Sequence, residues 1–466
     1  MMHAILRFAV VACSLVVVGA VSTTAAARPN IVIILADDLG YGDLGCYGHR
    51  EFKTPHLDRL AAEGAKLTQF NCPAPFCAPT RASLMTGRYP FRCGMTANPA
   101  PDGPAQVQSL HLPASEITLA QLLKGAGYAT GMVGKWHLGH TGPQWLPTHR
   151  GFDEYLGIPY SNDMRPVQLV EGDKRLEYPV VQANLTQRYT DRARSFIERN
   201  KERPFFLYLA HAMPHKPLAV SEEYYRKSES GLYGKVLSEL DASIGQVLAA
   251  LKEFQLDEKT LVIFTSDNGP WFGGSTRGLR GMKGSSYEGG YRVPCLARWP
   301  KKIPAGHVSA QPAVMMDIFA TALHVADVKP SPETVIDGRN ILPLFTSAAA
   351  SPHDAILGAQ GNKLATVRDA RWKLHVLAPR DQFMALNKSG ERWVDPRAPD
   401  GVTILAPYEQ YQPNEHPGLK TGVAPRAMQL FDLQNDPGEQ RDVAAENPQV
   451  VERLKKLFDA ANRDVP

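Results

Sequence analysis

Two pairs of polar residues in the sequence have the residue types of a metal site. Asp37 and Asp38 come just after one short apolar run. Asp267 and Asn268 come just after another. Carboxylate and amide oxygens are the ligands that Ca²⁺ and Mg²⁺ prefer in proteins. The same dipeptides also occur in turns and helix caps, but their repeated position after strand-like runs favours a site for a divalent metal.

A cysteine lies at the predicted start of a helix. Cys77 begins the segment Cys-Ala-Pro-Thr-Arg, which ends at Arg81. Pro79 suits the first turn of a helix, and a helix N-terminus favours anions. A thiol there is expected to be acidic and reactive. A structural, half-buried cysteine is the alternative, and the residue type alone favours that alternative.

Further along the chain, a lysine and several histidines follow apolar runs. Lys135 and His137 come after the run 129–133, and His211 and His215 come after a later one. Ammonium and imidazole groups can hold an anion and move protons. For each histidine a structural role is the alternative. Between the last two we favour His215 for chemistry and expect His211 to be a strand-end residue.

The elements that must position these residues alternate along the chain. Strands are predicted at 31–35, 129–133, 205–209, 261–265 and 293–297, and helices at 56–63, 117–124, 190–198, 233–252, 314–325 and 450–461. This alternation predicts an α/β fold with a large mixed sheet flanked by helices. In such sheets ligands bind outside the carboxyl ends of the strands, so the polar clusters predict one composite site.

The chain is divided by two further signals. A stretch rich in proline and alanine at 343–352 predicts a larger domain over 28–350 and a smaller C-terminal α+β domain over 351–466, with antiparallel strands and a terminal helix. Residues 1–27, with Arg7, a short apolar run and three alanines at the end, are typical of a signal peptide. The run is shorter than the roughly 20 residues that span a bilayer. We expect an exported protein that does not span the membrane, either periplasmic or secreted, or in a lysosomal-type compartment if eukaryotic.

Composition excludes one class of partner. The 466 residues carry a formal charge of +4 without long like-charged runs, which argues against a nucleic-acid binder. Of six cysteines, Cys13 lies within 1–27. The five that remain are an odd number, and the sequence leaves open whether Cys72 pairs with Cys93 or both are buried free thiols. Arg277 and Arg280 are expected at the solvated surface.

Longer patterns carry a resemblance over most of the chain. The Cys77–Arg81 segment, with Thr86 and Gly87 after it, is similar to the signature of the type I sulfatase family, in which the cysteine is oxidised to formylglycine. A second sulfatase pattern runs over 127–137. The resemblance continues to the segment 435–439. Segments 157–161 and 287–290 resemble the arylsulfatase A and N-acetylgalactosamine-6-sulfatase branch. Phe76 departs from the smaller residue that is usual there, which bears on maturation.

The resemblance implies an alkaline-phosphatase-like fold and a role for each candidate residue. The implied metal ligands are Asp37, Asp38, Asp267, Asn268 and an oxygen of the modified Cys77, with Ca²⁺ as the expected metal and Mg²⁺ as the alternative. Arg81 is implied to hold the formylglycine hydrate. The residues implied around the sulfate are Lys135, His137, His215, Lys283 and, as a further polar contact, Ser161. A formylglycine-generating enzyme is the implied maturation partner.

The chemistry of sulfate esters agrees with these implied roles. Attack on an anionic ester requires that its charge be neutralised, which a divalent cation with Lys135 and Lys283 can do. One hydroxyl of an aldehyde hydrate can attack sulfur while His215 or Lys283 protonates the leaving alcohol. Deprotonation of the other hydroxyl by His137 then expels sulfate. A serine or thiol would lack that exit.

We therefore expect an exported sulfatase that acts on a sulfated carbohydrate or an aryl sulfate. Two alternatives stay open. A phosphatase or phosphodiesterase on the same fold usually carries Ser or Thr where Cys77 stands. A non-catalytic exported glycan-binding relative would keep the fold without turnover.

Overall fold

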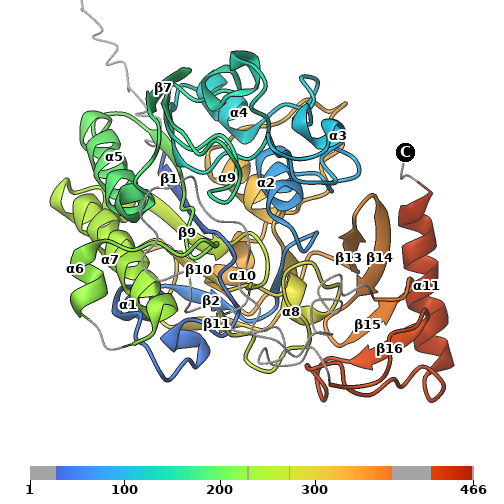
Figure 1. Cartoon of the computed structure of the whole chain (residues 1–466). Coiled ribbons are helices and arrows are strands. Elements are labelled where there is room, and N and C mark those ends of the chain that lie inside the picture. The colour runs from blue at the N-terminus through green and yellow to red at the C-terminus, as the bar shows by residue number, and fades with distance from the viewer. Residues whose placement is uncertain (1–27, 228–229, 272, 380–420, 464–466) are drawn as a thin grey trace, which may run out of the picture.

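A mixed sheet of ten strands forms the centre of the protein in the computed structural model, which describes residues 28–227, 230–271, 273–379 and 421–463 (Figure 1). In order across the sheet the strands are β11 (His307–Ser309), β2 (Ala65–Leu67), β10 (Cys295–Arg298), β9 (Thr260–Ser266), β1 (Asn30–Ala36), β8 (Phe205–Ala210), β4 (Ala129–Gly134), β5 (Glu154–Gly157), β6 (Leu169–Glu171) and β7 (Lys174–Glu177). The five adjacent strands β9, β1, β8, β4 and β5 run parallel to one another. Strands β10, β6 and β7 are antiparallel to their neighbours. The predicted α/β class with a large mixed sheet is confirmed.

The central strands are buried over their full length. Every residue of β1, β8, β9 and β4 is buried, which is why these strands read as continuous apolar runs. Leu35 of β1 pairs with Ala210 of β8 and with Thr265 of β9. This register aligns the carboxyl ends, so the residues that follow these strands emerge at one edge of the sheet.

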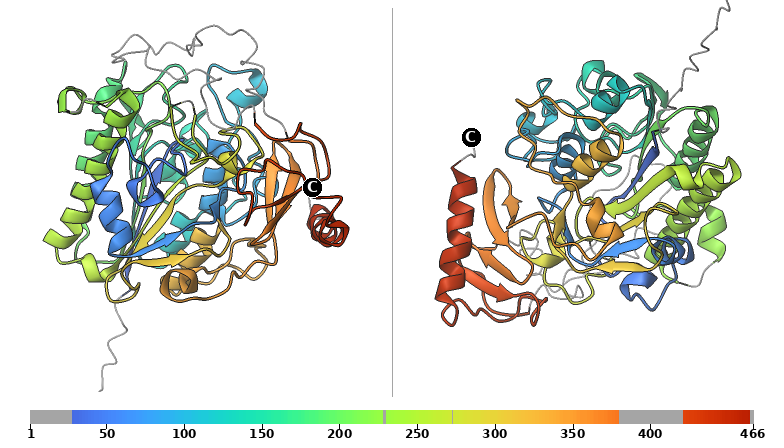
Figure 2. Two further views of the ribbon diagram at one scale, coloured as in Figure 1. Left: turned by 90° about the horizontal axis from the view of Figure 1, so that it is seen from below. Right: turned by 180° about the vertical axis from the view of Figure 1, so that it is seen from behind.

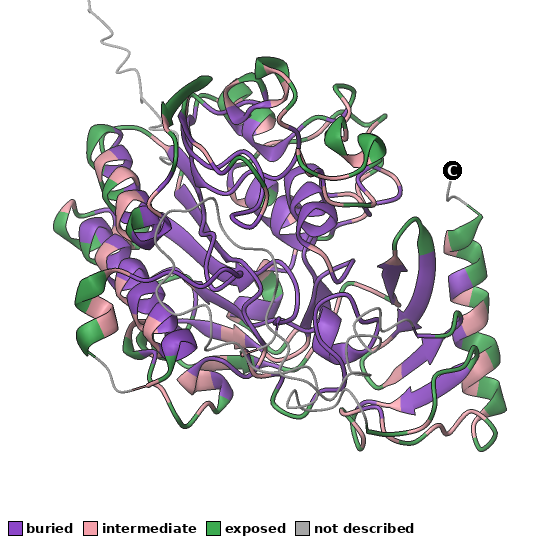
Figure 3. Cartoon of the chain, viewed as in Figure 1, coloured by how far each residue is buried: buried purple, intermediate pink, exposed green. Residues whose placement is uncertain are grey.

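Helices cover both faces of the sheet (Figures 2 and 3). One face carries α1 (Pro55–Ala62), α5 (Leu185–Arg199) and α7 (Leu232–Glu253), with α6 (Glu222–Lys227) against α7. The other carries α2 (Cys77–Thr86), α4 (Leu119–Gly125), α9 (Asp317–Val325) and α10 (Leu342–Thr346). The remaining short elements are α3 (Ala105–Gln108), α8 (Glu288–Tyr291), a parallel pair of β3 (Phe70–Asn71) and β12 (Ala313–Val314), and 3-10 turns at Gly45–Tyr47, Pro143–Trp145, Pro147–His149, Gln182–Asn184 and Asp257–Lys259.

A second, antiparallel sheet forms the C-terminal part of the chain. Its four strands, in order, are β13 (Ile356–Gln360), β14 (Lys363–Arg368), β15 (Trp372–His375) and β16 (Gln429–Asp432). The terminal helix α11 (Pro448–Asn462) packs on β14 and β15 with its buried Leu454 and Phe458. We call this sheet, α11 and the described segments that join them, residues 356–379 and 421–463, the C-terminal module. Figure 2 shows it at one side of the central sheet, with α11 outermost.

Three predicted elements begin two or three residues later than the sequence indicated. One is the helix predicted at 117–124, which begins at Leu119 after its N-cap residue Thr118. The strand predicted at 293–297 begins at Cys295, because Pro294 has no N–H to donate to a neighbouring strand. The helix predicted at 314–325 begins at Asp317, because Val314 pairs with Asn71 in β12 and β3 and its N–H donates to the Asp317 carboxylate.

Three further expectations concern the signal peptide, the domain boundary and membrane-spanning helices. The predicted signal peptide over 1–27 lies outside the described residues. The boundary after residue 350 stays a prediction. Among the helices that the structure describes, none has the length and apolar character to cross a membrane.

Candidate functional site

Residues that follow three of the central strands meet at the carboxyl edge of the sheet. Asp37 follows β1, Asp267 follows β9, Lys135 follows β4, and none of the three side chains is exposed. Gly134 allows this close approach, because a Cβ on it would lie 1.7 Å from the Ala210 carbonyl oxygen and its φ is +112°. The Lys135 N–H donates to that same carbonyl at 2.8 Å. The register of the sheet therefore delivers charged groups into one buried point.

The predicted metal ligands lie together around Cys77. The Cys77 Sγ is 3.4 Å from Asp37 Oδ1 and 3.8 Å from Asp38 Oδ1. Asn268 Nδ2 donates to Asp38 Oδ1 at 2.7 Å, and Asp267 Oδ1 accepts from the Asp38 N–H at 3.1 Å. All five predicted ligands are thus brought to one place from β1, α2 and β9.

The donor set fits a hard divalent cation. Asn268 Oδ1 is buried and has no hydrogen-bond partner among the described residues, and turning the amide over would aim this oxygen where Nδ2 now meets Asp38. Asp37, Asp38, Cys77 and His215 each offer a ligand atom, all within 4.8 Å of one another. Asp267 is held instead by Arg81, whose Nε donates to its Oδ2 at 3.0 Å. The five predicted ligands together offer oxygen from four side chains and the Cys77 sulfur, and oxygen ligands are what Ca²⁺ or Mg²⁺ requires.

Three cations face the three carboxylates. Lys135 Nζ lies 2.5 Å from Asp37 Oδ2, and Lys283 Nζ lies 2.8 Å from Asp38 Oδ2 and 3.3 Å from Cys77 Sγ. Arg81 Nη2 lies 2.8 Å from Asp267 Oδ2. The formal charges of this cluster therefore balance. A bound divalent cation would leave a surplus of positive charge, which favours an anionic substrate.

The pKa values of two groups differ from what their local sequence suggests. Burial and the Asp267 carboxylate raise the pKa of the Cys77 thiol well above its ordinary value. Burial is the larger cause, so the acidic thiol expected at a helix N-terminus does not hold for this unmodified cysteine. Burial, Lys135 and Arg81 hold the pKa of His137 well below its ordinary value. His137 is thus a neutral imidazole that can accept a proton.

The remaining candidates lie beside the same cluster of charged groups. Ser161 Oγ accepts from Lys135 Nζ at 3.0 Å and lies 3.4 Å from His215 Nε2. His215 Nε2 is also 3.6 Å from Asp38 Oδ2. His215 and Lys283 keep 5% and 7% of their surface exposed, whereas Lys135 and His137 keep none. His211 points elsewhere, with Nε2 3.3 Å from Ser243 Oγ of α7.

Two contacts of the site escaped the sequence analysis. Asn98 Oδ1 accepts from the Ala78 N–H at 3.0 Å, and the Pro99 carbonyl lies 3.1 Å from His137 Nε2. Neither residue type carries a signal of its own, and both lie in a loop distant in sequence. Arg280, expected at the surface, is 4% exposed, whereas Arg277 is exposed as expected. None of the five cysteines after residue 27 is paired in the structure.

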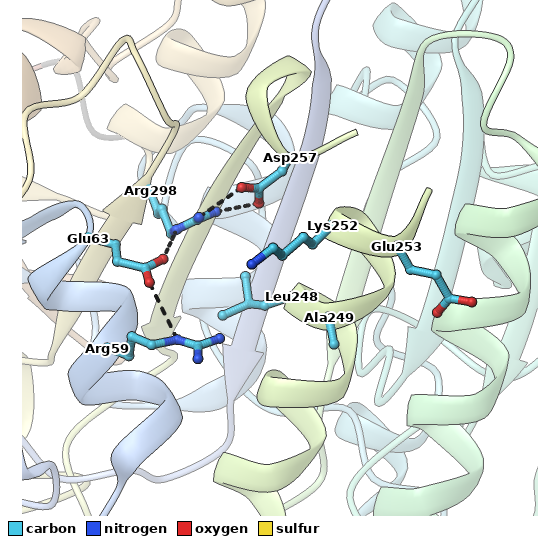
Figure 4. A pocket seen from close by; sticks show the side chains of 8 residues that line it. All are labelled: Arg59, Glu63, Leu248, Ala249, Lys252, Glu253, Asp257 and Arg298. Carbon is cyan, nitrogen blue, oxygen red and sulfur yellow. Dashed lines mark hydrogen bonds and ion pairs between the residues drawn. The ribbon is translucent and has the colours of Figure 1, made fainter. Parts of the chain in front are cut away.

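A separate groove lies at the opposite edge of the sheet (Figure 4). It is lined by Arg59, Glu63, Leu248, Ala249, Lys252, Glu253, Asp257 and Arg298. Arg298 pairs with both Glu63 and Asp257, and Arg59 pairs with Glu63. The groove contains none of the candidate residues, and four of its charged side chains pair with one another.

Comparison with known families and proteins agrees with this geometry. The family model described as Sulfatase matches residues 29–328. Human arylsulfatase A is 36% identical and covers 95% of this chain and 90% of its own length. N-acetylgalactosamine-6-sulfatase of Canis lupus familiaris is 36% identical, covering 92% and 84%. Steryl-sulfatase of Mus musculus is 34% identical, covering 93% and 80%.

A solved structure extends the similarity to the fold. The crystal structure of Ps i-CgsB in complex with k-i-k-neocarrahexaose superposes with a TM-score of 0.75. It is 28% identical in sequence, and the match covers 94% of each chain. The match therefore includes the C-terminal module as well as the central sheet.

Proposed function

Since this chain belongs to the sulfatase family and is a sulfuric ester hydrolase, we propose that it releases sulfate from a sulfated carbohydrate. The reaction uses a formylglycine, which is made from Cys77, and it also uses one divalent metal ion. The observation that carries the proposal is the meeting of Asp37, Asp38 and Lys283 around the Cys77 sulfur, at distances of 3.3 to 3.8 Å.

The metal is held by Asp37, Asp38, Asp267, Asn268 and an oxygen of the modified Cys77. We propose Ca²⁺, with Mg²⁺ as the alternative, because the Asp and Asn side chains of this set bind metals through oxygen. Such an ion supplies charge neutralisation at the sulfate oxygens. The orphaned oxygen of Asn268 supports this assignment.

Formylglycine hydrate supplies a carbon with two hydroxyl groups, one to attack sulfur and one to release it. Conversion of Cys77 is needed because a thiol would have no such exit, and burial raises the pKa of the unmodified thiol well above its ordinary value. Arg81, which is fully buried beside Asp267, orients the hydrate.

The other residues of the site handle charge and protons. Lys135 and Lys283 hold the sulfate oxygens, and Ser161 supports Lys135 through their hydrogen bond. His215 or Lys283, which keep 5% and 7% of their surface exposed, protonates the leaving alcohol. His137, kept neutral by burial and by Lys135, accepts the proton of the second hydroxyl.

Similarity supports the substrate class and compartment that we propose. N-acetylgalactosamine-6-sulfatase is named for a sulfated sugar, and Ps i-CgsB was crystallised with a neocarrahexaose. Steryl-sulfatase is named for a different alcohol, so sterol sulfate belongs in the test. Export, to the periplasm, the medium or a lysosomal-type compartment, rests on the signal-peptide pattern of residues 1–27.

The test compares nitrophenyl sulfate, nitrophenyl phosphate, steryl sulfate and sulfated oligosaccharides. The protein is produced together with a formylglycine-generating enzyme, and Cys77→Ala is the matched variant. We expect release of sulfate that is lost in Cys77→Ala and in chelator, and restored by Ca²⁺. Phosphate turnover that survives Cys77→Ala would contradict the assignment of the nucleophile. Turnover of steryl sulfate alone would contradict the carbohydrate substrate.

A further inference from the structure

The segment 435–439 takes no part in the proposed chemistry, yet its last residue is completely buried. Glu439 follows β16 in the C-terminal module and is 0% exposed. It lies against the loop 280–288, which carries Lys283 and leads into α8. Figure 1 shows α8 between the central sheet and the four-stranded sheet. A buried carboxylate at this junction requires partners.

Glu439 contacts both ends of the loop that carries Lys283. At the start of the loop, Arg280 Nη1 donates to the Glu439 carbonyl at 3.1 Å, and Arg280 Nη2 donates to the Val423 carbonyl at 2.9 Å. At the end of the loop, the Glu288 N–H donates to Glu439 Oε2. Glu439 of the C-terminal module therefore contacts both the first and the last residue of this loop, Arg280 and Glu288.

The C-terminal module in turn holds Glu439 in place. Its Oε1 lies 3.1 Å from Lys373 Nζ and 2.7 Å from His375 Nε2, both on β15. Lys373 Nζ also lies 3.1 Å from Glu288 Oε1, and Arg368 of β14 lies 2.8 Å from Glu288 Oε2. The carboxylates of Glu439 and Glu288 are thus joined by one shared cation, Lys373, away from water, where such pairs are least screened.

The loop continues this connection to the reacting atoms. Its backbone meets the two segments beside the metal ligands: the Lys283 N–H donates to Pro270 O at 3.0 Å, and the Gly284 N–H donates to Pro75 O at 2.9 Å. In α8, the Gly290 carbonyl accepts from the Gly269 N–H at 3.0 Å. The position of the loop therefore decides where the Lys283 ammonium lies relative to Asp38 and Cys77.

We propose that Glu439 is a positioning residue for Lys283, through which the C-terminal module controls the geometry of the active site. Glu439 touches neither substrate nor metal. It fixes the loop 280–288 at both ends, so that the Lys283 ammonium stays beside the nucleophile and Asp38. This inference rests on the role proposed for Lys283 above.

The test is a double-mutant cycle in the full chain, produced with formylglycine and Ca²⁺ and assayed on nitrophenyl sulfate. Glu439→Gln keeps the shape of the side chain and removes its charge. Asp442→Asn is the matched control, since its carboxylate contacts Leu430, Ala444 and Arg426 within the C-terminal part of the chain. Each variant is combined with Lys283→Ala and with Lys135→Ala. Thermal midpoints are recorded for all.

We expect Glu439→Gln to lower kcat/KM about tenfold or more, and to add less than about threefold when Lys283 is already alanine, because residues that act as a unit are not additive. In the Lys135→Ala background the full loss should recur. Asp442→Asn should stay within about twofold of wild type. If Glu439→Gln does not fold, Arg280→Lys removes the contact at the start of the loop and is measured in the same cycle.

Two results would overturn the inference, and they can be told apart. A loss that is fully additive with Lys283→Ala would mean that Glu439 acts through general stability, while the role of Lys283 would stand. Wild-type turnover in Lys283→Ala itself would remove Lys283 from the chemistry. In that case the role proposed for Lys283 falls, and this inference falls with it.

Discussion

Lys135 is a fully buried lysine whose ammonium group lies 2.5 Å from the Asp37 carboxylate and 3.0 Å from Ser161 Oγ. Replacement by alanine should cost about 2–4 kcal/mol of transition-state stabilisation, as the loss of one preorganised charge-stabilising donor does. The measurement is kcat/KM on nitrophenyl sulfate, corrected for the folded fraction by circular dichroism.

Lys124→Ala is the control for that prediction. Lys124 also pairs with an aspartate, Asp153, at 2.8 Å, but its side chain is 48% exposed. We expect its loss to leave turnover unchanged. A change below about tenfold in Lys135→Ala, equivalent to about 1.4 kcal/mol, would place Lys135 outside the reaction.

At the scale of elements, Asp43 joins three parts of the chain that support the site. Its carboxylate accepts from the Gly40 N–H after β1, from Tyr233 of α7 and from the Ser275 N–H after β9. Burial raises the pKa of Asp43 to about 7, although these hydrogen bonds oppose the shift. The folded protein therefore binds a proton at Asp43 more tightly than the unfolded chain.

The sign of the pH dependence follows from that shift. The contribution of Asp43 to stability should be fully present below pH 4, and up to about 4 kcal/mol of it should be lost as the pH rises to about 7. Denaturant unfolding from pH 4 to 8 tests this, because Asp43→Asn should lack the dependence. Asp153 is the comparison, because burial is outweighed there by Lys124 and Thr130, which lower the pKa of its carboxyl. Asp153 should therefore stabilise the fold more as the pH rises, and Asp153→Asn should remove that dependence of stability on pH. Parallel profiles for wild type and Asp43→Asn would contradict the prediction.

At the scale of the whole molecule, the C-terminal module is joined to the larger part of the chain by buried charge and apolar surface. Glu288 is held by Arg368 and Lys373 of the module. Tyr89 and Phe91, from the larger part, belong to the same apolar cluster as Leu454 of α11. A chain that ends at residue 350 would leave buried charges without partners, and breaking such pairs costs about 3–5 kcal/mol.

We therefore predict that residues 28–350 do not form an active enzyme on their own. The fragment and the full chain are compared by size-exclusion chromatography, near-ultraviolet circular dichroism and turnover. We expect aggregation or a loosely packed fragment without turnover. A monomeric, cooperatively unfolding fragment that hydrolyses nitrophenyl sulfate would show that the predicted boundary separates independent domains.

Much of the fold could be predicted because its signals are local. The buried strands β1, β4, β8 and β9 read as apolar runs, and each was located within one residue at either end. The pairs Asp37–Asp38 and Asp267–Asn268 were identifiable because residue type and short spacing carry their chemistry, whereas Cys77 was identified through its resemblance to the sulfatase signature. Val314 was placed in a helix because its pairing with Asn71 joins residues more than two hundred positions apart, which periodicity does not register.

The sequence by itself determined the class of fold and supplied the candidate metal ligands, because apolar periodicity and residue type are local properties. The role of Cys77 as nucleophile was implied only by its resemblance to the sulfatase signature. Only the tertiary structure decided that the Cys77 thiol is protonated, that Arg280 is buried and that Glu439 holds the loop of Lys283. The physical reason is that desolvation and ion pairing depend on which distant segments pack together. That packing is a property of the folded chain as a whole.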